Sequence, residues 1–367
     1  PRESGMAETT RIITSEDVGR IVSHVGIDRL MDETMQRLID ACVGYDPSLT
    51  PVRERDGFHY SEPEQGLMEW MPAMRVGQHT TLKMVGYHPR NPARRGLPTI
   101  LATIGAYDAV TGHMLALTDG TFATALRTGA ASGVASRFLA KSGSRVLGIV
   151  GCGAQAVTQA HAIGRVFDID QILYFDVDAD AAASFPARAS RWLDPGVDFR
   201  AAPVDLLVQS ADIVCTATSA PVGAGPLFDE VETHPWLHIN AVGSDFQGKQ
   251  ELPLGFLRAA LVVPDHLEQA GKEGECQWLE AQEIGPSLAE LVADPERYAG
   301  AKDGLTVFDS TGWALEDHVV VEMLLEYAED LDVGTDLPVE YIPQDPLDPY
   351  GLVAEGDGSG GIRRART

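Results

Sequence analysis

A glycine-rich turn at residues 151–156 is the first feature of this chain that suggests chemistry. It consists of Gly151-Cys152-Gly153-Ala154-Gln155-Ala156. The first glycine permits a tight turn, the second lets the backbone approach a pyrophosphate, and the small residue at the third position lets a helix pack against a strand. A helix that begins here would direct its free N–H groups at the phosphates. The turn therefore predicts a nucleotide-binding crevice.

Asp176 lies 25 residues beyond Gly151, at the end of the strand expected at residues 171–175. Its carboxylate would accept hydrogen bonds from the adenosine ribose and would repel a 2′-phosphate, so the expected cofactor is NAD and not NADP. Thr216 and Thr218 follow a later strand. That position suits the far side of the crevice, but a plain loop would explain it equally well.

Four charged side chains lie where chemistry or pairing is needed. Lys83 is in an expected β-strand and Arg127 is in an expected helix of small residues, so both require anions. Glu69 lies in an apolar strand, where it contacts either a substrate amine, a cationic cluster or solvent. Asp245 follows a parallel strand at its carboxyl end, where doubly wound folds place ligands, or it caps a helix after a Gly-Ser turn.

No metal site is expected from the histidine and cysteine spacing. His88 stands before Pro89 without a partner at ligand spacing, so a hydrogen-bonded turn histidine explains it better. Without C-x-x-C spacing, the cysteines predict neither a zinc site nor a disulfide framework, and they favour a reducing cytoplasm. They are Cys42, Cys152, Cys215 and Cys276. Cys152 is interpreted as a small filler of the turn.

The chain of 367 residues has 28 basic and 54 acidic side chains, a formal net charge of −26. This charge would repel nucleic acids and anionic membranes. No uncharged apolar run approaches the roughly 20 residues needed to span a bilayer, so a soluble, cytoplasmic protein is expected. Residues 1–5, before Met6, are interpreted as a remnant that precedes the natural start and not as a signal peptide.

The elements that must position these side chains change in character along the chain. Helical periodicity at residues 14–44 is followed by short β-rich segments that predict an antiparallel sheet, at residues 66–71, 80–85, 99–104 and 114–117. A helix is expected at residues 123–140. After a break at 141–144, strand, turn, helix and strand at residues 146–175 predict a βαβ unit with a parallel sheet. Further strands are expected at 213–216, 238–241, 261–263 and 305–309.

These patterns predict an α/β protein with two domains. A Rossmann-type NAD-binding domain is expected at residues 143–313. A second, α+β domain is expected from the N- and C-terminal segments, residues 6–142 and 314–350, the latter beginning with an amphipathic helix that opens with Glu316 and Asp317. Residues 351–367, rich in Gly, Ser and charge, predict a disordered tail.

Several longer stretches resemble the ornithine cyclodeaminase and μ-crystallin family in order and spacing. They are KMVGYHPRNP at residues 83–92, GLPT at 96–99, TALRTGAAS at 124–132, HINAVGSDFQGKQEL at 238–252, EGECQ at 273–277 and FDSTG at 308–312. Residues 69–72, 265–270 and 345–350 look most like the bacterial branch that converts lysine to pipecolate. The resemblance implies a tightly held NAD and a second domain that binds substrate and forms a homodimer.

The resemblance also implies a redox-neutral reaction on a small diamino acid, L-lysine or L-ornithine. The α-amine is oxidised by hydride transfer to NAD, the terminal amine attacks the imine, ammonia leaves, and the hydride returns. Such a site needs a cationic clamp for the carboxylate, a carboxylate for the amines and protection from water.

The family's site residues carry over to matching positions of this chain. Lys83 and Arg127 are placed at the substrate carboxylate, and Arg127 also near NAD. Asp245 is placed as the general base, a role suited to a carboxylate with a neighbouring lysine, and Lys83 is the second catalytic residue. Arg53 would be the third cation, although its loop-like surroundings also fit a solvated arginine. Substrate contacts include Glu69 and Thr311. Cofactor contacts are implied for the 151–155 turn, Asp176, Thr216 and Thr218, and also for Thr99, Val242, Gly243, Ser244, Lys249 and Ser310.

Two other functions remain open at this point. A one-way dehydrogenase or imine reductase, acting on alanine, an opine-like conjugate or a cyclic ketimine, would exchange NAD and NADH stoichiometrically. A crystallin-like protein would bind the nucleotide without turnover, although it would have no need of the base Asp245.

Overall fold

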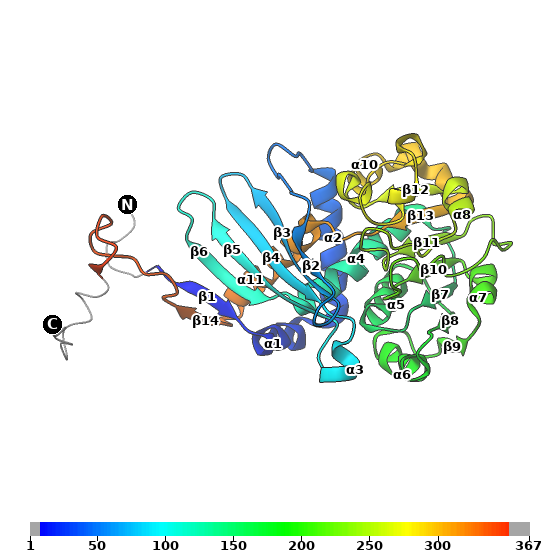
Figure 1. Cartoon of the computed structure of the whole chain (residues 1–367), viewed down its shortest axis with the longest axis horizontal. Helices are drawn as coiled ribbons and strands as arrows, with labels where there is room; N and C mark the ends of the chain where they lie inside the picture. Colours follow the sequence, from blue (N-terminus) through cyan, green and yellow to red (C-terminus); the bar gives the residue numbers. More distant parts are fainter. Residues whose placement is uncertain (1–7, 352–367) are drawn as a thin grey trace.

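The computed structural model describes residues 8–351, so the predictions for residues 1–5 and for nearly all of the tail at 351–367 lie outside the described residues. Within the described part, the strands form two seven-stranded sheets. The sheets lie beside each other with α2 and α4 between them (Figure 1). This arrangement confirms an α/β fold with a Rossmann-type part and a second α+β part.

The first sheet has the order β14-β1-β6-β5-β4-β3-β2. All neighbouring strands are antiparallel except β1 and β6, which are parallel. The expected antiparallel sheet therefore forms, but β1, β2 and β14 were not expected. The strands are β1 Thr10–Ile13, β2 Asp56–Tyr60, β3 Gly66–Arg75, β4 His79–Tyr87, β5 Ile100–Asp108, β6 Met114–Asp119 and β14 Thr335–Leu337.

The second sheet has the order β12-β13-β11-β10-β7-β8-β9, and every pair in it is parallel. The chain order reverses beside β7, and ligand crevices form at such switch points. The strands are β7 Val146–Val150, β8 Gln171–Phe175, β9 Asp198–Ala201, β10 Ile213–Thr216, β11 His238–Ala241, β12 Leu261–Pro264 and β13 Thr306–Asp309. β9 was not expected, since this short edge strand is largely exposed and lacks an apolar run.

Helices fill the space between and around the sheets. The α-helices are α1 Ser15–Val25, α2 Ile27–Val43, α3 Asn91–Arg95, α4 Thr121–Leu139, α5 Ala154–Val166, α6 Ala179–Ala189, α7 Val204–Ser210, α8 Leu254–Ala259, α9 Leu267–Ala270, α10 Leu288–Ala293 and α11 Ala314–Asp330. Short 3-10 helices are η1 Ser190–Trp192, η2 Cys276–Trp278, η3 Ala281–Glu283 and η4 Pro295–Asp303. Among residues 8–351, no helix is both long and apolar enough to cross a membrane.

Helix α4 connects the two parts of the molecule because its small residues allow close packing. It contacts α2, α5, α11 and strands β5, β11 and β13. A Cβ on Gly129 would lie 2.6 Å from the Thr158 carbonyl oxygen, and one on Gly133 would lie 2.6 Å from the Met35 sulfur. This packing fixes the position of Arg127, which α4 carries.

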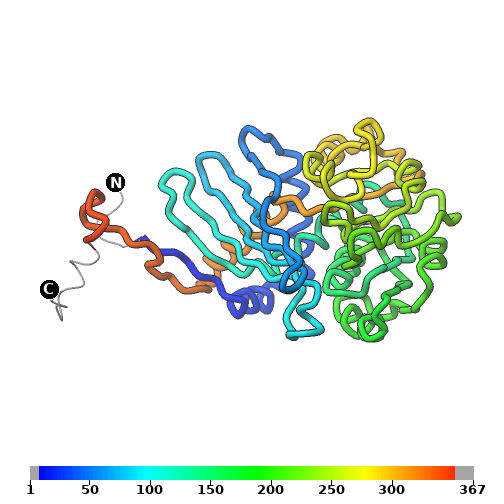
Figure 2. Tube along the Cα trace, viewed as in Figure 1, coloured from blue at the N-terminus to red at the C-terminus, as the bar shows by residue number. Residues whose placement is uncertain are grey.

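Helix α11 returns the chain from the second sheet to the first, as the orange part of the tube shows (Figure 2). The prediction of an amphipathic helix is wrong for its first half, which is buried on all sides. Glu316 and Asp317 are 1% and 2% exposed. The physical reason is that α11 packs against β3, β4, α2 and α4 together, so it has no solvent face there.

Candidate active site

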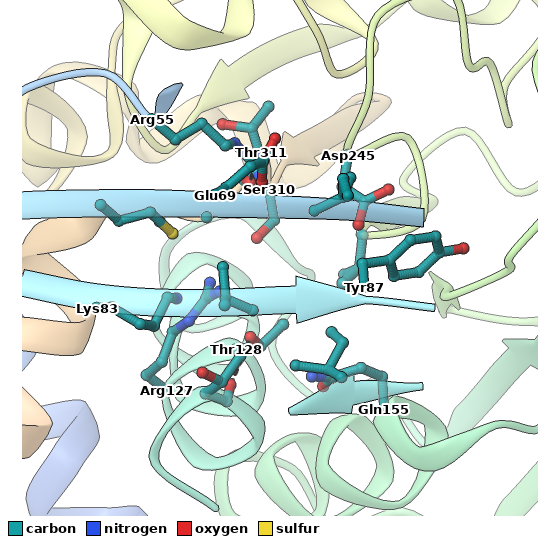
Figure 3. A pocket seen from close by; sticks show the side chains of 17 residues that line it. Arg55, Glu69, Lys83, Tyr87, Arg127, Thr128, Gln155, Asp245, Ser310 and Thr311 are labelled. Carbon is teal, nitrogen blue, oxygen red and sulfur yellow. Dashed lines mark hydrogen bonds and ion pairs between the residues drawn. The ribbon is translucent and has the colours of Figure 1, made fainter. Parts of the chain in front are cut away.

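A pocket lies where β3, β4 and α4 of the first part meet the carboxyl edge of the parallel sheet. Its lining includes eight residues expected at the site: Glu69, Lys83, Arg127, Gln155, Val242, Asp245, Ser310 and Thr311. Arg55 and Tyr87 also line it and were not expected. Lys83 and Arg127 lie beside each other, with Asp245 on a loop of the second part (Figure 3).

Lys83 is held in the floor of the pocket by a carboxylate of α11. Its side chain is 1% exposed, and its Nζ donates a hydrogen bond to Asp317 Oδ2 at 2.6 Å. Burial lowers the pKa of Lys83 to about 8, although Asp317 opposes this shift. Asp317 is thus the anion that was predicted to accompany Lys83. The pKa of Lys83 lies closer to neutral pH than that of an ordinary lysine.

Arg127 is paired with two acids at the start of the same helix. Its Nη1 donates to Glu316 Oε2 at 2.9 Å, and its Nε lies 3.3 Å from Asp317 Oδ1. Burial opposes the charge of Arg127, but Asp317 and Glu316 offset it and its pKa is raised. Burial also raises the pKa of Glu316 to about 8. From the sequence, Glu316 and Asp317 were predicted only to begin a helix, because their pairing with Arg127 depends on contacts between residues far apart in the chain.

The third cation of the pocket is Arg55, and Arg53 does not line it. Arg53 is exposed and lines a different hollow, beside α10 and Trp313. Arg55 donates from Nε to Glu273 Oε1 at 2.6 Å and from Nη2 to the Thr311 carbonyl. The segment between Val52 and β2 has no regular periodicity, so the sequence could not tell which arginine faces inward.

Glu69 is buried, at 3% exposure, and sits beside Arg55 in the pocket wall. Its Oε2 lies 3.5 Å from Arg55 Nη1 and its Oε1 lies 3.0 Å from His59 Nε2. Burial raises the pKa of the neighbouring Glu273 to about 7, against the attraction of Arg55. Glu69 and Glu273 therefore place two carboxylates on the Arg55 side of the pocket.

Asp245 reaches the pocket from the loop after β11. Its Oδ1 accepts a hydrogen bond from Lys249 Nζ at 2.8 Å, and about a third of the side chain, 32%, stays exposed. Burial disfavours the charge of Lys249, but Asp245 and Tyr87 outweigh it and raise the Lys249 pKa. The ammonium also lies 5.0 Å from the centre of the Tyr87 ring. Asp245 is thus anchored on one side and accessible on the other.

The glycine turn that was predicted to hold a pyrophosphate lies between β7 and α5. Gly151 has φ +93°, and a Cβ there would lie 2.6 Å from the Ala217 carbonyl oxygen. Gly153 precedes α5 without a side-chain cap, and a Cβ on it would meet no described atom within 4 Å. The Cys152 N–H donates to Asp176 Oδ2 at 2.6 Å. Burial raises the pKa of the Cys152 thiol to about 12, which fits a filler and not a nucleophile.

A buried glutamate that the sequence analysis missed, Glu251, joins the loops on the far side of this crevice. It accepts hydrogen bonds from the Thr216 hydroxyl at 2.6 Å and from the Thr218 N–H and hydroxyl at 2.9 and 2.7 Å. It also accepts one from the Gly243 N–H at 2.9 Å. The two threonines therefore hold loops together through Glu251. The sequence offered no signal for this role beyond an acid within the 238–252 stretch.

The remaining predicted residues divide between the pocket and its surroundings. Ser310 lines the pocket, and its buried hydroxyl has no hydrogen-bond partner among the described residues. The Thr311 hydroxyl donates to Asp265 Oδ1, and the Ser244 hydroxyl donates to the Lys249 carbonyl. Thr99 does not line the pocket; it immediately precedes β5, and its carbonyl accepts the His88 N–H.

These features fit a dinucleotide. The open space at Gly153 and the uncapped start of α5 leave N–H groups for phosphate, since the first N–H groups of a helix have no partner within it. Asp176 stands at the carboxyl end of β8, where a ribose would lie. The unpartnered hydroxyl of Ser310 offers a further polar contact within the pocket.

Comparison with known proteins agrees with this geometry. The L-lysine cyclodeaminase of Streptomyces rapamycinicus is 42% identical over 345 residues, covering 94% of this chain and 99% of that protein. One solved structure is that of a lysine cyclodeaminase and concerns the recognition of L-lysine, L-ornithine and L-2,4-diaminobutyric acid. It has a TM-score of 0.90 and 47% identity, and the match covers 94% of this chain and 100% of that one. An archaeal alanine dehydrogenase dimer with bound NAD has a TM-score of 0.75 and 32% identity, covering 91% and 100%.

A sequence model of one family accounts for most of the chain. The ornithine cyclodeaminase/mu-crystallin family matches residues 16–331. The residues that line the pocket and the glycine turn all lie within this range. The chain therefore belongs to the ornithine cyclodeaminase/mu-crystallin family.

Proposed function

We propose that this protein is an NAD-dependent cyclodeaminase that converts an L-α,ω-diamino acid to a cyclic amino acid with release of ammonia. L-lysine, giving L-pipecolate, is the preferred substrate, and L-ornithine, giving L-proline, is the second. One observation carries the proposal: Lys83, Arg127 and Arg55 share a pocket with Asp245 and Glu69 at the edge of the dinucleotide crevice.

The charges of the pocket suit a substrate with two amines. The lining residues and their ion-pair partners supply four cations, Arg55, Lys83, Arg127 and Lys249. They also supply five carboxylates, Glu69, Asp245, Glu273, Glu316 and Asp317. A diamino acid with both amines protonated carries one net positive charge. Its second ammonium can pair with a carboxylate of the pocket such as Glu69, whereas alanine has no second amine to do so.

The chain's own residues have distinct tasks in this reaction. Lys83, Arg127 and Arg55 hold the α-carboxylate by charge-assisted hydrogen bonds. Asp245, positioned by its hydrogen bond from Lys249, takes the proton of the α-ammonium and later returns one. Glu69 faces the terminal ammonium.

Gly151, Gly153 and the start of α5 would hold the pyrophosphate of NAD, and Asp176 would hold the adenosine ribose. When bound, NAD supplies the oxidising and reducing power at the substrate α-carbon. Val242 and Ser310 line the pocket beside the crevice. They connect the cofactor site to the substrate site.

The proposal includes a cytoplasmic homodimer with two domains per subunit, residues 143–313 for NAD and residues 6–142 and 314–350 for substrate and dimerisation. Three exposed apolar side chains support the dimer: Met84 on β4, Leu101 on β5 and Leu115 on β6. The pairing registers place them on the same face of the first sheet, away from Lys83. Sedimentation at varied protein concentration tests this assembly.

The test of function uses purified protein saturated with NAD. Incubation with L-lysine, L-ornithine or L-2,4-diaminobutyrate, followed by mass analysis and ammonia determination, should give equal amounts of ammonia and cyclic product without net NADH. Stoichiometric NADH formation or consumption would instead indicate a dehydrogenase or imine reductase. Absence of turnover by protein that carries NAD would indicate a nucleotide-binding protein.

A further inference from the structure

Strand β4 and helix α11 are joined by a ladder of polar contacts that extends away from the active site. Alternate residues of β4, namely His79, Thr81 and Lys83, face α11. Lys83 meets Asp317, Thr81 meets His318, and His79 meets Glu322. The first contact belongs to the active site. The far end of the ladder has no role in the proposed reaction.

We propose that His79, His318 and Glu322 form a site for one divalent transition-metal ion of the zinc class. His79 Nε2 lies 3.2 Å and His318 Nε2 lies 3.6 Å from Glu322 Oε1, and the three ligand atoms all lie within 4.8 Å of one another. Zinc bonds of about 2.0–2.2 Å in a tetrahedron place neighbouring ligand atoms about 3.3–3.6 Å apart. Two imidazoles and one carboxylate also form a recognised zinc ligand set.

The two imidazole rings lie nearly parallel, with centroids 4.8 Å apart and an interplanar angle of 11°, and one of them carries the hydrogen bond that fixes a metal ligand. His318 is fully buried, at 0% exposure, and its Nδ1 lies 2.9 Å from the Thr81 hydroxyl oxygen. A hydrogen bond at Nδ1 fixes the ring and leaves Nε2 to face the metal. The Nε2 atoms of His318 and His79 are buried and form no well-oriented hydrogen bond in the described part of the chain, although each lies near Glu322 Oε1. An ion at this point would satisfy both.

The third ligand is positioned by helical spacing and by an arginine. His318 and Glu322 are four residues apart, so both lie on one face of α11. Arg75 Nη2 donates to Glu322 Oε2 at 3.2 Å, which leaves Oε1 for the histidines. This site was not predicted from the sequence, because His79 lies on a strand distant from α11 along the chain. Two side chains of the set, His79 and Glu322, are 19% and 18% exposed, which provides an entry path.

The competing interpretation is an ion-pair cluster in which Arg75 and protonated histidines surround Glu322 without a metal. Co²⁺ distinguishes the two, because a tetrahedral N/O site gives intense visible absorption and an ion-pair cluster gives none. Untagged full-length protein, treated with chelator and dialysed, is titrated with Co²⁺ and then with Zn²⁺. We expect one equivalent of Co²⁺ per chain, displacement by Zn²⁺, and a Zn²⁺-dependent rise in Tm.

Variants assign the binding to these residues. His79→Gln and Glu322→Gln should each weaken Co²⁺ binding at least tenfold and remove the rise in Tm. His234→Gln is the matched control, since this histidine stacks on Trp236 outside the cluster. Circular dichroism checks that the variants fold. His79 and Glu322 are both partly exposed, so the variants at these two positions decide the test even if His318→Gln, at a fully buried position, does not fold.

Two results would overturn the metal site. One is wild-type protein that binds no stoichiometric Co²⁺ or Zn²⁺, which would leave an ion-pair cluster only. The other is binding that His79→Gln and Glu322→Gln leave unchanged. Neither result bears on the proposed cyclodeaminase reaction, because none of the three residues lines its pocket.

Discussion

The ammonium of Lys83 lies 2.6 Å from the carboxylate of Asp317, and both side chains are almost completely buried. This contact joins the middle of β4 to the first turn of α11. Without it, a lysine in such a site would lose its charge, because burial already lowers the Lys83 pKa to about 8. The pair therefore sets the pH range in which Lys83 can hold a carboxylate.

Asp317→Asn should shift the alkaline decline of kcat/KM to lower pH. Since Asp317 raises the Lys83 pKa against burial, its removal takes that pKa below about 8. Loss of a neighbouring charge typically shifts a pKa by about one unit or more, so the decline should move by about that amount. The measurement is a pH profile with L-lysine. Asp330→Asn, at the exposed end of the same helix, is the control, and equal profiles for the two variants would refute the role of the pair.

Asp245→Asn should remove the base while leaving the cofactor site intact. General acid–base catalysis typically contributes about 10²- to 10⁴-fold, so kcat should fall by that factor while the Kd for NAD stays close to that of the wild type. Asp170→Asn, in an exposed pair with Arg145, should leave both values unchanged. Turnover within tenfold of the wild type would exclude Asp245 as the base.

Arg55→Gln and Arg53→Gln should behave differently, although they lie two residues apart. Arg55 lines the pocket and Arg53 is exposed outside it. A hydrogen bond to a charged group contributes about 1.5–3 kcal/mol, so Arg55→Gln should lower kcat/KM for L-lysine roughly 10- to 100-fold. Arg53→Gln should have almost no effect. Steady-state kinetics measure this difference, and a larger effect of Arg53→Gln would instead support Arg53 as the third cation of the site.

Gly153→Ala should weaken NAD binding without unfolding the protein. The position has φ −73°, which alanine adopts freely, and no described atom lies within 4 Å of the added Cβ. The methyl group would instead occupy space for the pyrophosphate. A tenfold or greater rise in the NAD Kd, about 1.4 kcal/mol, is expected with little change in Tm. Gly300→Ala, equally unobstructed but distant from the turn, controls for the substitution itself.

Glu251→Gln should weaken the hydrogen bonds that hold together the loops on the far side of the cofactor crevice. The amide retains one acceptor oxygen, so its NH₂ group would face some of the donors of Thr216, Thr218 and Gly243. Unsatisfied buried donors cost about 1–3 kcal/mol each. Both the Tm and the affinity for NAD should fall. Glu296→Gln, an exposed control, should change neither, and an unchanged NAD affinity in Glu251→Gln would reduce Glu251 to a purely structural role.

The sequence alone determined the features that depend on short-range pattern. The family assignment also came from the sequence, but it rests on the order and spacing of several stretches within residues 16–331. The βαβ order around the glycine turn and the strand bounds at 146–150 and 171–175 rest on residues close together along the chain. Local hydrophobic periodicity and glycine conformation suffice for these, because neighbouring residues alone fix them.

The tertiary structure decided which charges meet. Glu316 and Asp317 looked like an ordinary helix opening until α11 was placed against α4 and β4, where they pair with Arg127 and Lys83. Arg55, and not Arg53, lines the pocket, because the irregular segment before β2 directs the Arg55 side chain into it. The energy of a buried charge depends on partners that can lie hundreds of residues away, so only the folded chain reveals them.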